Sequence, residues 1–395
     1  MMTHDTKTFD MATRLTQLGR DPEAQHGFVN GPVYRGSTVL FKTMADLEQS
    51  RARFAYGTLG TPTIESLENA WTEITGAAGT VLSPSGLGAV ALALLTTLKS
   101  GDHLLMPDSV YRPTRDFCQH FLGRFGVEVS YYDPLLTDGI RDCFQSNTTT
   151  LFLESPGSQS FEIQDVPLLT RIARQHGIKT IIDNTWATPL FFRAHDHGCD
   201  LSVEAGTKYL GGHSDLLLGL VSANQATWPA LRKTYDSLAM LPGAEDCFLA
   251  LRSLRTMQLR VKEAERRGLE MAAWLQQQPE VKTILHPAFP SCPGHALWQR
   301  DFTGSTGLFS VILQPDFDKQ ALAAMLDHMA IFGMGYSWGG FESLIIPFDC
   351  RQYRTATEWN PGGLAIRLQI GLEDMQDLKT DLREGLDRMV AEKSR

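Results

Sequence analysis

Short apolar runs alternate with longer amphipathic stretches from residue 79 onward, and this alternation predicts strands followed by helices. The expected strands cover residues 80–82, 103–106, 127–132, 149–153, 180–182 and 201–203, and the expected helices cover residues 87–98, 113–125 and 166–176. Strands separated by helices usually pair in parallel. The pattern therefore predicts an α/β domain built on a mostly parallel sheet.

The segments before and after this alternating region have different patterns. The first sixty residues are rich in turn formers between short polar helical pieces, so we expect an arm that lies on a neighbouring subunit. Residues 246–278 form one long helical stretch, which we expect to cross to a second domain. Strands near 308–313 and 365–370 and helices near 319–328 and 375–392 predict a smaller α/β unit. The expected division is an arm (1–60), a large domain (61–250) and a connecting helix with a small domain (251–395).

Composition narrows the classes of partner. The chain has 395 residues, of which 43% are hydrophobic and 21% charged, and these values are typical of a soluble globular protein. Its net charge of −9 argues against nucleic acid or an anionic membrane, so we expect a small-molecule ligand. The longest apolar segment, residues 88–98, is too short to span a bilayer, and we expect a cytoplasmic protein. The six cysteines form no CxxC pair, which favours reduced thiols over disulfides or a metal site.

Two residues near predicted strand ends, Asp183 and Lys208, are the main candidates for chemistry. Asp183 directly follows the run 180–182, and Lys208 lies in a turn of small residues after the run 201–203. A lysine amine can form a Schiff base with an aldehyde cofactor, and a carboxylate can hold a pyridine nitrogen protonated. A buried salt bridge between the two residues is the structural alternative.

Three further features are compatible with such a cofactor. Gly86 and Leu87 connect a predicted strand to a helix, where backbone N–H groups can bind a phosphate. Tyr111 follows a strand end, and its ring could lie on a planar cofactor. Arg367 is a lone arginine in an apolar strand, where it could bind a substrate carboxylate or an internal acid. Taken singly, the turn and the tyrosine are better explained by ordinary local structure and core packing.

Six motifs occur in order along nearly the whole chain: ESPGS (154–158), IIDNTWA (181–187), GTKYLGGHSD (206–215), RDFTGSTGLFS (300–310), YSWGGFESL (336–344) and IRLQIGLED (366–374). Through these motifs the chain resembles the pyridoxal 5′-phosphate (PLP) enzymes of cysteine and methionine metabolism, most of all their bacterial cystathionine β-lyase branch. The resemblance implies an aspartate-aminotransferase-type fold (PLP fold type I), with an arm, a large domain and a small domain. It also implies a homotetramer that is a dimer of dimers.

The resemblance implies a role for each candidate residue. Lys208 would bind PLP covalently and shuttle a proton, Asp183 would hold the pyridine nitrogen, and Tyr111 would stack on the ring. The other implied contacts are Gly86, Leu87 and Thr207 with the phosphate, Tyr56 with the phosphate of the adjacent subunit, and Arg367, Ser337 and the Trp338 backbone with the substrate carboxylate.

Two positions favour β-elimination within this family. The γ-lyases and γ-synthases tend to carry leucine where this chain has Trp338, and an Asn-Pro pair where it has Gly157 and Ser158. The expected reaction cleaves the C–S bond of an L-cysteine thioether to a thiol, pyruvate and ammonia. One alternative is a γ-lyase acting on a homocysteine-like or O-substituted homoserine-like amino acid, which would yield 2-oxobutyrate. The other is a PLP-binding regulatory protein, which would not need a proton shuttle.

One position departs from the family pattern. The family usually has Tyr-Gly-Arg in the arm, whereas this chain has Tyr56, Gly57 and Thr58. The missing arginine removes a charge-assisted phosphate contact worth roughly 1.5 to 3 kcal/mol. We therefore expect either another cation in its place or a substrate other than cystathionine.

Overall fold

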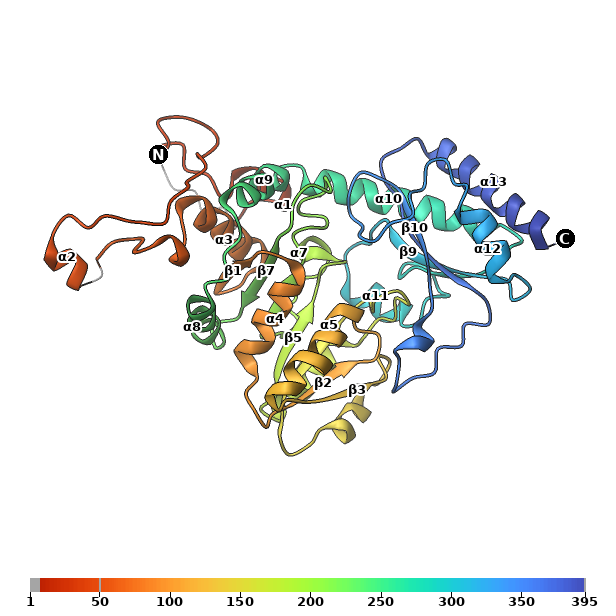
Figure 1. Cartoon of the computed structure of the whole chain (residues 1–395), viewed down its shortest axis with the longest axis horizontal. Coiled ribbons are helices and arrows are strands. Elements are labelled where there is room, and N and C mark those ends of the chain that lie inside the picture. The colour runs from red at the N-terminus through yellow and green to blue at the C-terminus, as the bar shows by residue number, and fades with distance from the viewer. Residues whose placement is uncertain (1–7, 50, 394–395) are drawn as a thin grey trace.

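The computed structural model describes residues 8–49 and 51–393. Figure 1 shows a central sheet domain, an N-terminal arm that projects from one side of it and a smaller domain on the other side. Helix α10 (Met257–Leu275) runs from the large domain toward the small one. None of the helices in the described ranges combines the length and the apolar character needed to cross a membrane.

A seven-stranded sheet with the order β1-β7-β6-β5-β4-β2-β3 forms the large domain. Its strands are β1 (Gly79–Ser83), β2 (His103–Pro107), β3 (Glu128–Tyr132), β4 (Thr148–Glu154), β5 (Lys179–Asp183), β6 (Leu201–Glu204) and β7 (Gly219–Ala223). Strands β6, β5, β4, β2 and β3 pair in parallel, which confirms the mostly parallel sheet. The sequence reading missed β7, which is antiparallel to both of its neighbours.

Helices cover both faces of this sheet, so its middle strands bury apolar side chains on both faces. The helical segments are α3 (Pro62–Thr75), α4 (Gly86–Thr97), α5 (Arg112–Asp116), a π turn (Phe117–Phe121), a 3-10 turn (Leu122–Phe125), a 3-10 turn (Asp138–Cys143), α6 (Val166–Gln175), α7 (Thr188–Phe191) and α8 (Trp228–Leu238). Along β4, Leu151 and Leu153 belong to one buried cluster, and Phe152 belongs to the cluster on the other face. The expected helix 113–125 is present as a continuous helical course of three types.

The N-terminal segment has two parts with different environments. Helix α1 (Met11–Gln17) packs on its own large domain, where Leu15 is buried and Arg14 pairs with Glu73. The 3-10 turn Gly57–Leu59 lies where the chain returns to α8, and helix α2 (Met44–Glu48) belongs to the part that projects away in Figure 1. This part exposes apolar side chains, and Leu40 is 88% exposed. Such exposure is typical of a surface that another chain covers.

The prediction of one helix over residues 246–278 is wrong. Two helices occupy the region, α9 (Ala244–Leu254) and α10, because Thr256 leaves the helical conformation with φ −109° and ψ 4°. At this break, the Arg255 guanidinium donates hydrogen bonds to the Leu15 and Leu18 carbonyl oxygens. The break redirects the chain from the large domain toward the small one.

The small domain has an antiparallel four-stranded sheet in the order β10-β11-β9-β8. Its elements are β8 (Val281–Leu285), α11 (His295–Asp301), β9 (Leu308–Leu313), α12 (Lys319–Leu326), β10 (Leu344–Phe348), a 3-10 turn (Cys350–Gln352), β11 (Ala365–Gln369) and α13 (Met375–Lys393). Both expected strands and both expected helices are present. The unpredicted strands β8 and β10 are the edges of the sheet, where Lys282 and Pro347 interrupt the apolar pattern.

Candidate functional site

Asp183 and Lys208 lie on one hydrogen-bonded framework at the carboxyl ends of β5 and β6. Asp183 ends β5, and its Oδ1 accepts hydrogen bonds from the Thr185 hydroxyl (2.6 Å) and N–H (3.0 Å). The same hydroxyl oxygen accepts the Ala205 N–H (2.9 Å), and the Ala205 carbonyl accepts the Lys208 N–H (3.0 Å). Among the described residues the two side chains form no ion pair, so the salt-bridge alternative is wrong.

The Lys208 amine is positioned by a segment of the small domain. Its Nζ donates a hydrogen bond to Ser337 Oγ (2.7 Å) and lies 5.5 Å from the centre of the Trp338 ring. Burial and the nearby Arg367 lower the pKa of Lys208 to about 8, although Asp183 opposes this shift. A lower pKa leaves more of the amine unprotonated near neutral pH, and the unprotonated amine is the nucleophile that attacks an aldehyde.

The backbone of the segment around Ser337 is constrained. Ser337 has φ +93°, a value that costs a non-glycine residue about 1 to 3 kcal/mol. Gly339 has φ +80°, and a Cβ there would lie 3.0 Å from the Tyr209 nitrogen. The Trp338 ring also lies against the Tyr209 ring, with 5.5 Å between centroids. These contacts hold the Ser337 hydroxyl at the lysine amine.

Arg367 lies in the middle of β11 and is 8% exposed. Its Nη2 donates to the Ser337 carbonyl oxygen (3.0 Å), while its buried Nε has no hydrogen-bond partner among the described residues. Burial lowers the pKa of Arg367 to about 10. No acid within the described part of the chain pairs with it, so the internal-acid alternative is wrong. A guanidinium with an unused buried donor fits an incoming carboxylate.

Glu154, which the sequence reading did not assign, lies beside Asp183. It ends β4 and pairs in register with Asp183 across the parallel strands. Its Oε2 accepts the Tyr111 backbone N–H (2.8 Å). Burial raises the pKa of both carboxyls above their ordinary values. The available signal was an acid directly after the expected strand 149–153, the same pattern that drew attention to Asp183.

Tyr111 lies at the start of α5 on the same edge of the sheet and is 44% exposed. Burial of its hydroxyl raises its pKa, and the charges of Asp183 and Glu154 raise it further, whereas Arg367 opposes them. The backbone of Tyr111 is fixed here by its N–H, which donates to Glu154 Oε2 (2.8 Å). This placement brings Tyr111 to the group formed by the other candidate residues.

The start of α4 offers free backbone donors. Ser85 caps this helix by accepting the Gly88 N–H (3.0 Å), and the N–H groups of Gly86 and Leu87 have no partner among the described residues. A Cβ on Gly86 would lie 2.6 Å from the Ala205 Cβ, so only glycine allows this approach of helix and turn. Free N–H groups at a helix start fit a phosphate.

Thr207 and Tyr56 are less directly placed. The Thr207 hydroxyl donates to the Leu218 carbonyl (3.2 Å) and accepts the Leu218 N–H (3.0 Å). It would have to give up the donated bond in order to donate to a phosphate. Tyr56 lies in the arm, forms an isolated bridge with Thr38 and is 48% exposed. Its contact with a neighbouring subunit stays a prediction.

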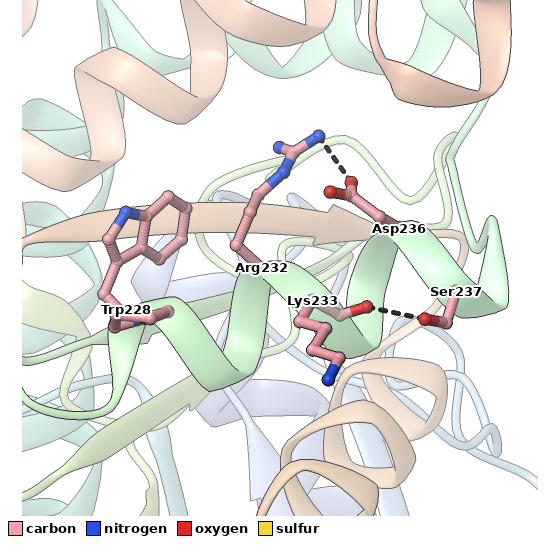
Figure 2. Close-up of a pocket in the computed structure, with 6 residues that line it drawn as sticks. Trp228, Arg232, Lys233, Asp236 and Ser237 are labelled. Carbon is pink, nitrogen blue, oxygen red and sulfur yellow. Dashed lines mark hydrogen bonds and ion pairs between the residues drawn. The ribbon is translucent and has the colours of Figure 1, made fainter.

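An open depression on α8 lies apart from these residues. Figure 2 shows Trp228, Lys233 and the Arg232–Asp236 ion pair (2.7 Å) along it. Arg232 also contacts the Leu59 carbonyl of the arm (3.4 Å). The depression contains none of the candidate residues, and we assign no chemistry to it.

Known proteins are similar to this chain over most of its length. Residues 12–387 match the model of a family described as Cys/Met metabolism PLP-dependent enzyme. A putative cystathionine beta-lyase of Saccharomyces cerevisiae is 59% identical over 84% of this chain and 97% of its own length. The cystathionine beta-lyase of Escherichia coli is 40% identical over 96% of this chain and 98% of its own length.

A solved structure supports the fold. The crystal structure of cystathionine gamma synthase from Xanthomonas oryzae, in complex with aminoacrylate and cysteine, is 28% identical. The match covers 97% of this chain and 99% of that one, with a TM-score of 0.89. The expected aspartate-aminotransferase-type architecture is thereby confirmed.

Proposed function

Because the chain belongs to the Cys/Met metabolism PLP-dependent enzymes, we propose that it cleaves the C–S bond of L-cystathionine or a related L-cysteine thioether. The products would be a thiol, pyruvate and ammonia. One observation carries the proposal most directly: Lys208, Ser337 and Arg367 converge from two domains on one place. There a covalent anchor for PLP would lie beside a guanidinium that has an unused donor for an amino-acid carboxylate. The relatives named cystathionine beta-lyase support the substrate class.

In this proposal each residue holds a group or moves a proton. PLP, when bound, withdraws electrons from the substrate α-carbon and so makes loss of a β-substituent possible. Lys208 holds PLP and, once released, takes the α-proton at its Nζ; Ser337 fixes the direction of that amine. Arg367 holds the substrate carboxylate, with Ser337 and the Trp338 backbone beside it.

The remaining contacts belong to PLP. Asp183 would keep the ring nitrogen protonated, and Tyr111 would cover the ring. The proposed phosphate contacts are Gly86, Leu87, Thr207 and, from an adjacent subunit, Tyr56. The free N–H groups at the start of α4 support the first two of these contacts.

The wider setting is also part of the proposal. A homotetramer, assembled as a dimer of dimers, would cover the exposed apolar side chains of the arm, among them Phe28 and Met44. We propose a cytoplasmic location and no nucleic-acid or membrane partner, in keeping with the net charge of −9. The division into arm, large domain and small domain at residues 60 and 250 also stays a proposal.

An assay of oxo-acid products tests the reaction. A panel that contains cystathionine, other cysteine thioethers, homocysteine-like amino acids and O-substituted homoserines is offered to the PLP-loaded protein. Pyruvate from the cysteine skeletons is the expected result. If 2-oxobutyrate from the homocysteine skeletons dominates, the γ-lyase alternative is correct. Absence of turnover with bound PLP would favour the regulatory alternative.

The covalent site is tested separately. Borohydride reduction and peptide mapping should find the reduced cofactor on Lys208. Label on any other lysine would contradict the central assignment, whatever the product assay gives.

A further inference from the structure

Two carboxyl groups, one buried and one half-buried, lie side by side at the carboxyl ends of two central strands of the large sheet. Glu154 and Asp183 are the last residues of the adjacent parallel strands β4 and β5, and they pair in register. Residues paired in this way point to the same face of a sheet. Among the described residues neither carboxyl has an ion-pair partner, and Glu154 is 8% exposed.

The groups around Glu154 do not favour a charge on it. Asp183 faces it from β5 and Tyr111 from the start of α5, and its own backbone N–H is bonded to the Gln164 side-chain oxygen (3.0 Å). Burial raises the pKa of Glu154 well above its ordinary value, and the charge of Asp183 raises it further. The cations Lys208 and Arg367 act instead on Asp183 and Tyr111 respectively. Two adjacent buried carboxylates cannot both ionise without a large cost.

The hydrogen bonds decide which of the two keeps the proton. Asp183 accepts two donors from Thr185, and the charge of Lys208 also favours its ionised form. Glu154 accepts a single donor, the Tyr111 N–H. The charge therefore resides on Asp183.

We propose that Glu154 is a positioning residue that keeps its proton at neutral pH, so that the pair presents one negative charge, on Asp183, to the ring nitrogen of the cofactor. Its second task is to hold Tyr111 at the ring through the backbone N–H. The inference rests on the proposed role of Asp183 toward PLP. It assigns Glu154 no contact with the reacting atoms.

Two substitutions at Glu154 test separately the effect of its charge and the effect of its hydrogen bond to Tyr111. In Glu154→Gln the amide is neutral and still offers an oxygen to Tyr111, so PLP should bind within about twofold of the wild-type affinity. Glu154→Ala leaves the Tyr111 N–H unpaired, and PLP should bind roughly tenfold more weakly. PLP affinity is measured by fluorescence titration. Equal weakening in both variants would overturn the proposal. A protonated Glu154 is neutral, so the neutral glutamine should be able to replace it.

Glu162 provides a matched control on the same segment. It is 6% exposed, as deeply buried as Glu154, but its carboxylate pairs with Arg354 (2.8 Å). Glu162→Gln should lower the unfolding midpoint, since it removes the charge that compensates the buried Arg354. Glu154→Gln should not lower it. A similar loss in both variants would show that Glu154 is ionised too, which contradicts the proposal.

Infrared spectroscopy reads the proton itself. Spectra of the purified full chain at neutral pH, with and without PLP, should contain a protonated-carboxyl stretch that Glu154→Gln abolishes. In the chain without PLP, Asp183→Asn should shift the pH midpoint of this band downward, because a neighbouring negative charge is gone. If Glu154→Gln removes no such band, the proposal is wrong. This measurement involves no turnover, so its failure is distinguishable from failure of the proposed lyase reaction.

Discussion

Asp108, which is fully buried, and Asp183, which is half-buried, both lie at carboxyl ends of strands of one sheet, yet their surroundings differ. Asp108 directly follows β2 and accepts hydrogen bonds from Arg115 (2.9 Å) and from backbone or hydroxyl groups of residues 355–357. Asp183 accepts hydrogen bonds only from Thr185 within the described chain. Burial raises the pKa of Asp108, but the bonds from Thr355, Arg115 and Thr357 outweigh it and leave the pKa below its ordinary value. The pKa of Asp183 is raised.

The difference distinguishes an acid that only stabilises the fold from an acid that can still accept a hydrogen bond from a ligand. Asp108 has a complete set of donors, so its charge is compensated by the protein alone. Asp183 has one oxygen supplied with donors and faces a place where Lys208 and Arg367 also converge. A buried carboxylate with an incomplete set of donors is therefore the better indicator of a ligand. The following experiments test this distinction.

The largest effect is expected for Asp108→Asn. The amide leaves Arg115, whose side chain is 2% exposed, without its counter-charge, so the free energy of unfolding should fall by about 3 to 5 kcal/mol. Denaturant unfolding measures this loss. Asp318→Asn serves as the control, because asparagine caps α12 as well as aspartate does. If the free energy of unfolding falls no more in Asp108→Asn than in the control, Asp108 is not a structural acid.

Asp183→Asn should have the opposite profile. The protein should fold and bind PLP, but lyase turnover should fall on the order of 100-fold or more, since an amide cannot keep the ring nitrogen protonated. Its unfolding midpoint should stay near wild type. Steady-state pyruvate formation and denaturant unfolding are compared in the same preparation. Near-normal turnover in this variant would show that Asp183 is not needed to keep the pyridine nitrogen protonated.

Arg367→Lys should show a smaller effect, confined to substrate capture. An ammonium cannot reproduce the planar two-bond grip of a guanidinium, so kcat/KM should fall by roughly tenfold to 100-fold. Arg351→Lys is the matched control, because Arg351 pairs with Asp349 on the surface. Equal kcat/KM values for Arg367→Lys and the control would place the carboxylate site elsewhere.

The smallest effect is expected in the arm. Thr58 is exposed in the single chain, and Thr58→Arg restores the family's usual residue. PLP should bind more tightly by about 1 kcal/mol if the arm reaches the neighbouring phosphate. Thr380→Arg adds the same charge on α13 and should change nothing. If both variants bind PLP with the same affinity, the proposed contact of the arm with the neighbouring active site is wrong.

The sequence predicted those parts of the fold whose patterns are local. Six of the seven strands of the large domain were recognisable because each is a short run of strand-forming residues flanked by turns or helices. The edge strand β10 was not, since Pro347 interrupts its apolar pattern. The break between α9 and α10 coincides with hydrogen bonds from Arg255 to the Leu15 and Leu18 carbonyls, contacts that hydrophobic periodicity cannot reveal.

The site was predictable as a set of residue types but not as a set of neighbours. Lys208, Ser337 and Arg367 are far apart in sequence, and only the packing of two domains brings them together. The sequence indicated that they are close only through the family resemblance, which implies that all three belong to one active site. Glu154 was missed because its importance depends on strand order, since β4 lies next to β5 in the sheet. No local pattern contains that adjacency.

The hydrogen bonds of Asp108 also limit how the molecule can move. Residues 355–357 belong to the small domain, as does Arg354, which pairs with Glu162 of the large domain. A hinge motion that separated the domains there would break several charge-assisted hydrogen bonds, each worth about 1.5 to 3 kcal/mol. Rigid-body opening at this contact is therefore energetically costly, and we expect small molecules to enter through local motions. The side chain of Tyr336, which is 87% exposed, can move in this way, whereas the backbone of the next residues is held by the contacts of Ser337 and Trp338.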